Sequence, residues 1–317
     1  MAQMSSVRRF LKRTRGWQPL NLLITSTGRA AQRSLKLSPD WLLKHVPRSG
    51  RVEARLPNGR CLRFWTQGDD RTPNHIYWKG WLGHEPETMG LFYALAQRSR
   101  TIIDVGAYVG LYALVGGHAN PTAHVFAFEP VPHVFERLSI NVAMNILDNV
   151  SCVRSAVARH VGSGWLRVPA TTFPTGSSLS ADFSVKKRSH TTPVQVSVTS
   201  LDGFCENLGL TDVDLVKIDT EGTEVDVLEG MSRVIERNRP TIISEVLAGS
   251  PTARIIQILG SYGYSSYCLG HSGPIAGWPG EVSSVGRNFL FTAADSQTHL
   301  DMVFHGNDSM DVGGRST

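Results

Sequence analysis

The chain has 317 residues, of which 41% are hydrophobic and 19% are charged, proportions that are ordinary for a globular protein. Its 32 Lys and Arg residues against 27 Asp and Glu residues give a formal net charge of +5, which is too small to indicate nucleic-acid binding. The four cysteines form no Cys-x-x-Cys pair, which argues against zinc and against a disulfide framework. We expect free thiols, a cytoplasmic location, and no nucleic-acid partner. No apolar run approaches the ~20 residues of a membrane span, and no signal-peptide core follows the basic start.

Residues 1–84 are expected to form an N-terminal extension. Basic residues cluster in its first part, at Arg8, Arg9, Lys12, Arg13 and Arg15, with apolar residues among them. This pattern fits an amphipathic helix that touches anionic lipid or a partner, although a solvated helical extension is the favoured interpretation. The sequence leaves the role of this extension open.

The later part of the extension has a clearer pattern. Residues 41–43 indicate a short helix, and residues 52–65 predict a β-hairpin that turns at Asn58-Gly59. A polar loop is expected from Gly68 to Asn74. A helix is then predicted over residues 88–97, so that the main domain begins near residue 85 and continues to residue 294.

The stretch Thr101–Gly110 reads T-I-I-D-V-G-A-Y-V-G and predicts a buried strand, a tight glycine turn and the start of a helix. Such a turn lets a nucleotide approach the backbone, and the helix start offers free N–H groups. Only Gly106 and Gly110 occupy glycine positions here, whereas a dinucleotide fingerprint is G-x-G-x-x-G. This difference disfavours NAD.

The next strand, His124–Phe128, ends at Glu129, an acid that can accept hydrogen bonds from both hydroxyls of a ribose. A D-x-G-x-x-x-G turn followed by a strand ending in Glu fits S-adenosylmethionine better than NAD. We expect the acids at positions 104 and 129 to grip this nucleoside. After a helix over residues 133–145 and a strand over residues 150–153, Ser155 and Ala156 are expected to border the adenine.

Residues 160–200 depart from the α/β alternation. Short strands are predicted at residues 165–168, 179–185 and 194–198, separated by Gly, Ser, Thr and Pro. An insertion beyond the carboxyl edge of a sheet is a common place for substrate specificity. Gly176-Ser177-Ser178 is therefore a candidate for the acceptor site, with a simple solvent loop as the alternative.

A second informative stretch, Val213–Glu224, reads V-D-L-V-K-I-D-T-E-G-T-E. Strand alternation places Lys217 and Asp219 on one face, with Asp219 at the carboxyl end. They are either an ion pair of structural value or parts of a site, and the cost of burying charge favours the second interpretation. A single helix is predicted to run from Val225 to Ile235.

The remaining elements complete an α/β pattern. Residues 241–246 predict a buried strand that ends near Glu245, residues 255–259 a helix, and residues 262–269 a strand. Residues 288–292 are predicted to be the last strand, paired with the previous one. The polar residues 295–317 are expected to form a disordered tail.

Five ordered motifs together resemble the FkbM family of S-adenosylmethionine-dependent methyltransferases over roughly residues 85–293. They are D-V-G-A-Y-V-G-L-Y, F-A-F-E-P-V-P, S-V-T-S-L-D-G-F, K-I-D-T-E-G-T-E-V-D-V-L-E-G and R-P-T-I-I-S-E. The resemblance implies the class I methyltransferase fold: an α/β domain with a seven-stranded, mostly parallel sheet, an antiparallel last strand, and helices on both faces. It also implies O-methylation of a small-molecule hydroxyl, such as that of a sugar or polyketide.

Carried over by position, the motifs give two sets of candidate residues. Those expected to bind the cofactor are Asp104, Gly106, Ala107, Tyr108, Gly110, Glu129, Ser155, Ala156 and Asp219. Those expected to act in catalysis are Asp219, Glu221 and Lys217. Tyr108 departs from the Asn that the family usually has, and Thr223 departs from the more usual Ala.

Methyl transfer from a sulfonium is an in-line displacement, so alignment supplies much of its acceleration. A hydroxyl needs a proton acceptor, for which Asp219 is the first candidate and Glu221 the second, while Glu245 and nearby His residues remain possible. Mg²⁺ on Asp219, Glu221 and Glu245 is an alternative that we do not predict.

Three competing functions remain at this point. An N-methyltransferase is disfavoured because D-T-E-G stands where an Asn/Asp-Pro-Pro-aromatic segment is expected. An NAD-dependent oxidoreductase is disfavoured by the missing glycine. A non-catalytic nucleoside-binding scaffold is harder to reject. The sequence identifies neither the acceptor nor the oligomeric state.

Overall fold

The computed structural model describes residues 18–35, 38–169, 191–247, 250–271, 273–282 and 287–293. Its centre is an eight-stranded sheet in the order β12-β11-β13-β10-β9-β3-β4-β5. The strands are β3 (Thr101–Val105), β4 (His124–Phe128), β5 (Val150–Val153), β9 (Leu215–Ile218), β10 (Thr241–Glu245), β11 (Tyr264–Gly270), β12 (Gly273–Ala276) and β13 (Asn288–Ala293).

The five strands from β10 to β5 run parallel, and β13 is antiparallel to both of its neighbours, β10 and β11. This arrangement confirms the predicted α/β class with its mostly parallel sheet and antiparallel last strand. The predicted number of seven strands is wrong by one, because β12 pairs with β11 and adds an edge strand. In the sequence, β12 lies between β11 and β13.

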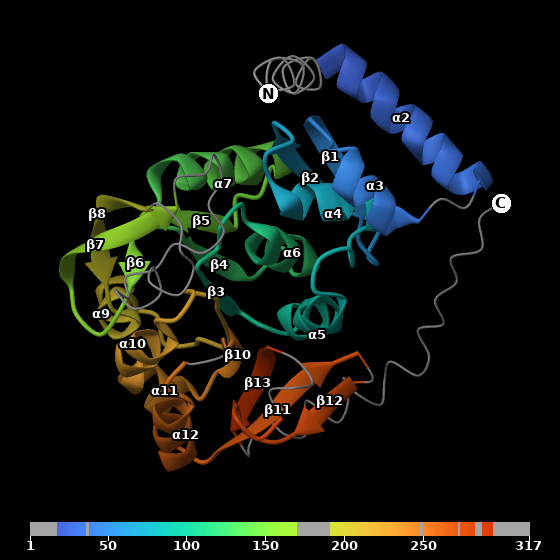
Figure 1. Cartoon of the computed structure of the whole chain (residues 1–317). Helices are drawn as coiled ribbons and strands as arrows, with labels where there is room; N and C mark the ends of the chain where they lie inside the picture. Colours follow the sequence, from blue (N-terminus) through green and yellow to red (C-terminus); the bar gives the residue numbers. More distant parts are fainter. Residues whose placement is uncertain are drawn as a thin grey trace.

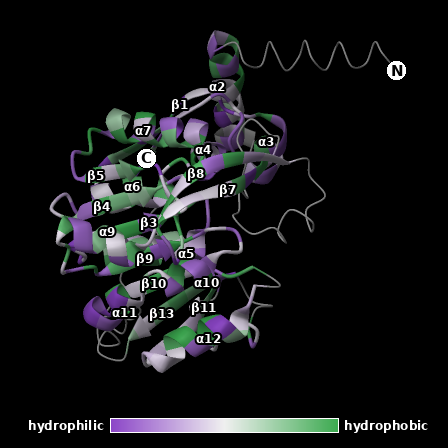
Figure 2. Ribbon diagram, turned by 90° about the vertical axis from the view of Figure 1, so that its left-hand side faces the viewer, coloured by the Kyte–Doolittle hydropathy of each residue, from purple (hydrophilic) through white to green (hydrophobic). Residues whose placement is uncertain are grey.

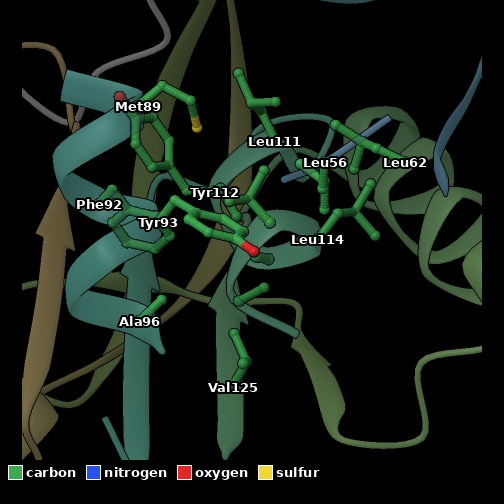
Figure 3. Packing of buried hydrophobic residues seen from close by; sticks show 14 of the residues in the cluster. Leu56, Leu62, Met89, Phe92, Tyr93, Ala96, Leu111, Tyr112, Leu114 and Val125 are labelled. Atoms are coloured by element: carbon green, nitrogen blue, oxygen red, sulfur yellow. The ribbon is translucent and has the colours of Figure 1, made fainter. Parts of the chain in front are cut away.

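Helices cover both faces of the sheet (Figure 1). One layer contains α5 (Pro86–Ala96), α6 (Leu111–Ala119) and α7 (Pro132–Asn145), and the other contains α9 (Leu201–Leu208), α10 (Glu224–Glu229), α11 (Ser232–Asn238) and α12 (Thr252–Ser261). Alternate residues of the strands pack against opposite layers: Ile102 lies in the hydrophobic cluster with α5, α6 and α7, which we call the first cluster, and Ile103 lies in the second cluster, with α9 to α12. Figure 3 shows part of the first cluster, where Phe92 of α5 and Tyr112 of α6 pack with ring centroids 4.8 Å apart.

The N-terminal segment contains two helices, a hairpin and a third helix: α2 (Gln18–Leu35), α3 (Pro39–His45), β1 (Gly50–Arg55), β2 (Cys61–Thr66) and α4 (Arg71–Lys79). The predicted hairpin and the short helix around residue 42 are confirmed. The polar loop predicted up to Asn74 is wrong, because the Asp70 side chain accepts from the Thr72 N–H (2.9 Å) and caps a helix that begins at Arg71.

The hairpin is fastened to α7 by two asparagines. The backbone N–H of Trp65 donates to Asn141 Oδ1 (2.8 Å), and that of Arg63 donates to Asn145 Oδ1 (2.9 Å). Helix α2 lies at the periphery in Figures 1 and 2 and is tied to α4, with Arg29 Nη2 donating to the Tyr77 carbonyl (2.6 Å).

The insertion forms a separate three-stranded sheet in the order β6-β8-β7. Its strands are β6 (Ala156–Val157), β7 (Gly162–Pro169) and β8 (Thr191–Thr199). The strands predicted around residues 165 and 194 are confirmed. The predicted strand at 179–185, Gly176-Ser177-Ser178, the basic cluster Arg8–Arg15 and the tail 295–317 lie outside the described residues.

The single helix predicted from Val225 to Ile235 is wrong: α10 ends at Glu229 and α11 begins at Ser232. Asp202 caps the second helix, accepting from the Val234 N–H at 2.9 Å. None of the helices formed by the described residues combines the length and apolar character needed to cross a bilayer. All four cysteines are free thiols, as predicted.

Candidate active site

A cavity of about 370 Å³ lies over the carboxyl ends of the central parallel strands. From β3 the chain adds β4 and β5 on one side, and it then crosses back to place β9 on the other side of β3. Such a switch point is where open α/β sheets bind ligands. By chain position and chemistry we divide the lining residues into two groups, which we call the nucleoside end and the acceptor end. The nucleoside end comprises Val105, Gly106, Tyr108, Phe128, Glu129, Pro130, Val131, Ser155, Ala156, Val157 and Leu166; the acceptor end comprises Arg71, Thr72, His75, His84, Glu85, Asp219, Thr220, Glu221, Thr223 and Glu245.

Gly106 makes the turn at the nucleoside end possible. Its φ is +80°, and a Cβ placed on it would lie 1.9 Å from the backbone oxygen of Asp219. Its N–H donates to the Phe128 carbonyl (3.0 Å), which holds the turn against β4. Only glycine fits this position, because the ends of β3 and β9 approach each other there.

Glu129 is the central acid of the nucleoside end. It is buried, and its two carboxylate oxygens accept from the backbone N–H groups of Val131 (2.8 Å) and Tyr108 (3.1 Å). Burial raises the pKa of Glu129 to about 8 against the opposing effect of these hydrogen bonds. Each oxygen keeps a lone pair, and this geometry suits a ligand with two neighbouring hydroxyl groups.

Three of the expected cofactor residues do not line the cavity. Asp104 is fully buried on the α6 side of the sheet, where its Oδ2 accepts from the Ala113 N–H (3.0 Å). The Ala107 N–H donates to the Phe128 carbonyl, and Gly110 is the N-cap of α6. Asp104 thus fixes the start of α6 beneath the turn. That it also grips the nucleoside stays a prediction.

Lys217 also lies behind the cavity wall. It is fully buried, with Nζ 3.7 Å from Asp219 Oδ2, 3.4 Å from the Ile218 carbonyl and 5.0 Å from the centroid of the Tyr112 ring. Burial lowers the pKa of this ammonium, but the surrounding carboxylates outweigh burial and raise it; they are Asp219, Glu85, Asp104 and Glu245. Lys217 is therefore a buried cation that holds these carboxylates together.

Asp219 and Glu245 stand side by side at the acceptor end. Burial and the neighbouring Asp219 carboxylate raise the pKa of Glu245 to about 8, while Lys217 opposes this shift. Glu221 also lines the cavity, with a left-handed φ of +56°. Glu224 has a structural role, since its Oε1 accepts from the Gly222 N–H (2.7 Å) and closes the turn.

The acceptor end contains residues that sequence reasoning missed. Arg71, Thr72 and His75 come from α4, and His84 and Glu85 come from the loop before α5. No motif spacing identifies them, because they precede the glycine turn at Gly106 and reach the cavity only through tertiary packing. The His84-Glu85 pair at the predicted domain boundary was the one available signal.

The described residues contain no group of three or more His, Cys, Asp or Glu side chains arranged to hold a metal ion. The Mg²⁺ alternative on Asp219, Glu221 and Glu245 therefore has no preformed ligand set in that part of the chain.

Three curated relatives have methyltransferase names. Methyltransferase sdnD of Sordaria araneosa is 30% identical over 158 residues, covering 41% of this chain and 60% of that protein. Hexuronic acid methyltransferase AglP of Haloferax volcanii is 27% identical over 188 residues (55% and 67%). The 2-O-methyltransferase NoeI of Sinorhizobium fredii is 26% identical over 156 residues (44% and 60%). The matched part of the chain thus spans about three fifths to two thirds of these relatives.

The model of the Methyltransferase FkbM domain matches residues 104–266, slightly more than half of the chain. This range begins at the buried acid of β3 and contains both the nucleoside end and the segment from Lys217 to Glu224. The chain therefore belongs to the family of the FkbM methyltransferase domain.

Proposed function

We propose that this protein is an S-adenosylmethionine-dependent O-methyltransferase that acts on a hydroxyl of a small metabolite. The observation that carries the proposal is that one cavity contains both Glu129, an acid placed to bind a ribose, and a group of carboxyl and imidazole side chains. One end has the shape and chemistry for a nucleoside, and the other has groups able to orient a hydroxyl and take its proton.

The residues at the nucleoside end fit this cofactor. Glu129 offers lone pairs to both ribose hydroxyls, and Gly106 leaves room for close approach to the backbone. Phe128, Val131 and Val157 supply an apolar wall for a base, beside Ser155 and Ala156. When bound, the cofactor supplies a methyl group on a positively charged sulfur, and the carboxylate of Asp219 favours a cation nearby.

The acceptor hydroxyl must lose its proton during transfer. Two groups at the acceptor end are candidates to receive it: the carboxylate of Asp219, which the sequence favours, and the imidazole of His84, which the structure adds. We propose that Asp219, fixed by Lys217 at 3.7 Å, orients the hydroxyl for the in-line displacement.

A sugar-like acceptor is supported by the name of one relative. AglP is named for a hexuronic acid, and NoeI is named for methylation at a 2-O position. A ring with several hydroxyls also suits the mixture of Arg71, His75 and carboxylates at the acceptor end, since each can accept or donate a hydrogen bond. A polyketide hydroxyl is the other acceptor class within this proposal.

Incubating the purified protein with methyl-labelled S-adenosylmethionine and fractionated metabolite extracts tests the proposal. We expect label on one compound and release of S-adenosylhomocysteine. Cofactor binding without label transfer to any fraction would instead indicate a non-catalytic scaffold. Binding of NADH in place of S-adenosylmethionine would overturn the cofactor assignment.

A further inference from the structure

His84 occupies a distinctive place at the acceptor end. It lines the cavity together with Glu85 and Asp219, although it precedes the part of the chain that matches the family model. Its ring packs edge-on against His75, with centroids 5.6 Å apart and planes at 82°. An imidazole that forms part of a carboxylate-lined cavity wall is suited to proton transfer.

The loop that carries His84 is held in place from both sides. Before it, the Gly83 N–H donates to the Gly80 carbonyl (2.9 Å), and the Gly83 carbonyl lies 3.1 Å from His75 Nδ1. Gly83 has no room for a side chain, because a Cβ would lie 2.4 Å from the His75 carbonyl oxygen. The imidazole is therefore anchored to α4 rather than carried on a loose loop.

After His84, Glu85 adopts a left-handed conformation with φ +46°, which is strained for a residue other than glycine. Its Oε2 accepts from the Tyr112 hydroxyl at 2.6 Å, and it faces the buried Lys217. Although burial raises the pKa of Glu85, Lys217, His84 and Tyr112 together lower it. This strained residue is thus an anion fixed beside His84.

Burial favours the neutral form of His84. Burial lowers its pKa; the anions Glu85 and Asp219 oppose this shift, and the cations Lys217 and Arg71 add to it. His75, the remaining ring beside it, also has a lowered pKa because of burial. A neutral imidazole can accept a proton, and the two carboxylates stabilise the imidazolium that results. Asp219, by contrast, already pairs with Lys217.

We propose that His84 is the general base of the methyl transfer, with Glu85 as its positioning residue. This inference rests on the proposed function. The acceptor O–H bond breaks as its proton passes to a ring nitrogen of His84, and the oxygen electron pair forms the bond to the methyl carbon. The electron pair of the broken carbon–sulfur bond stays on sulfur, and His84 then releases its proton to water.

The first test needs no acceptor. In NMR titrations of the full chain, with His84→Asn used to assign the resonance, His84 should titrate below the usual midpoint of about 6.5. Asp219→Asn should lower this midpoint further, because it removes an anion that faces the ring. A midpoint near 8, or no response to Asp219→Asn, would overturn the assignment.

The second test uses the labelled acceptor fraction from the metabolite screen. His84→Asn should bind S-adenosylhomocysteine within about threefold of the wild-type affinity, but lose about 10²–10⁴-fold in kcat. Added imidazole should restore part of the activity of His84→Ala. His124→Asn, at the amino end of β4 and outside the cavity lining, should behave as wild type. An unaffected His84→Asn variant would reject this inference alone, whereas failure of the wild-type protein to label any fraction in the preceding screen would reject the proposed function.

Discussion

The two ends of the cavity are built in different ways. The nucleoside end uses backbone geometry within one continuous stretch: the turn at Gly106, the Tyr108 N–H, and Glu129 after the next strand. The acceptor end is assembled from side chains far apart in the chain, with His84 from the loop before α5, Asp219 after β9 and Glu245 on β10. The nucleoside end is therefore set by local chain geometry, whereas the acceptor end depends on long-range packing around one buried cation, Lys217.

The largest expected effect tests that buried cation. Replacing Lys217 by Met should destabilise the fold by about 3–5 kcal/mol, because the carboxylates it faces would lose their only close buried cation among the described residues. Urea denaturation measures this loss. Lys79→Met, which removes an exposed pair with Asp40, is the matched control and should shift the midpoint little. Equal midpoints for the two variants would contradict this account of the acceptor end.

Gly106→Ala probes the nucleoside end by the same logic. A methyl group at this position must displace the Asp219 backbone, so S-adenosylhomocysteine affinity should fall by at least about 100-fold, or 2.7 kcal/mol. Calorimetric titration provides the measurement. Gly90→Ala in α5, where a Cβ meets nothing within 4 Å, should instead add about 0.5–1 kcal/mol of stability and leave binding unchanged.

A smaller change is expected from Glu129→Gln. The amide NH₂ must face one of the backbone N–H groups that the carboxylate now accepts from, and the ribose loses a charged acceptor. The affinity for S-adenosylhomocysteine should fall by about 10–100-fold. Exposed Glu136→Gln on α7 serves as the control. Unchanged binding by Glu129→Gln would remove the acid from the nucleoside end.

The smallest effect is a pH dependence of cofactor affinity. Because burial raises the pKa of free Glu129 to about 8, its carboxyl is mostly protonated below that pH. Two donating ribose hydroxyls favour the ionised form, so binding must release a proton. Affinity for S-adenosylhomocysteine should therefore rise by about tenfold between pH 6 and pH 7 and level off above pH 8. Glu129→Gln should lose this slope; a slope that persists unchanged would assign it to Glu245 or another group.

The sequence was sufficient for the parts governed by local periodicity. The strands around Ile102 and Val216, the glycine turn and the acid after β4 all follow from short patterns, and six of the expected cofactor residues reach one cavity. It was insufficient where tertiary packing decides. The burial of Asp104 against α6 depends on which face of β3 the helix covers. Helix α4 packs on the hairpin, and the hairpin is hydrogen-bonded to α7. No local sequence pattern predicts these long-range contacts, so the place of α4 and His84 at the site could not be predicted.

A crystal structure of the protein with S-adenosylhomocysteine would show whether Glu129 binds the ribose. We predict that both ribose hydroxyls lie within about 3 Å of the Glu129 carboxylate, with the thioether sulfur directed toward Asp219 and His84. A ligand bound outside this cavity, or a ribose turned away from Glu129, would contradict the account.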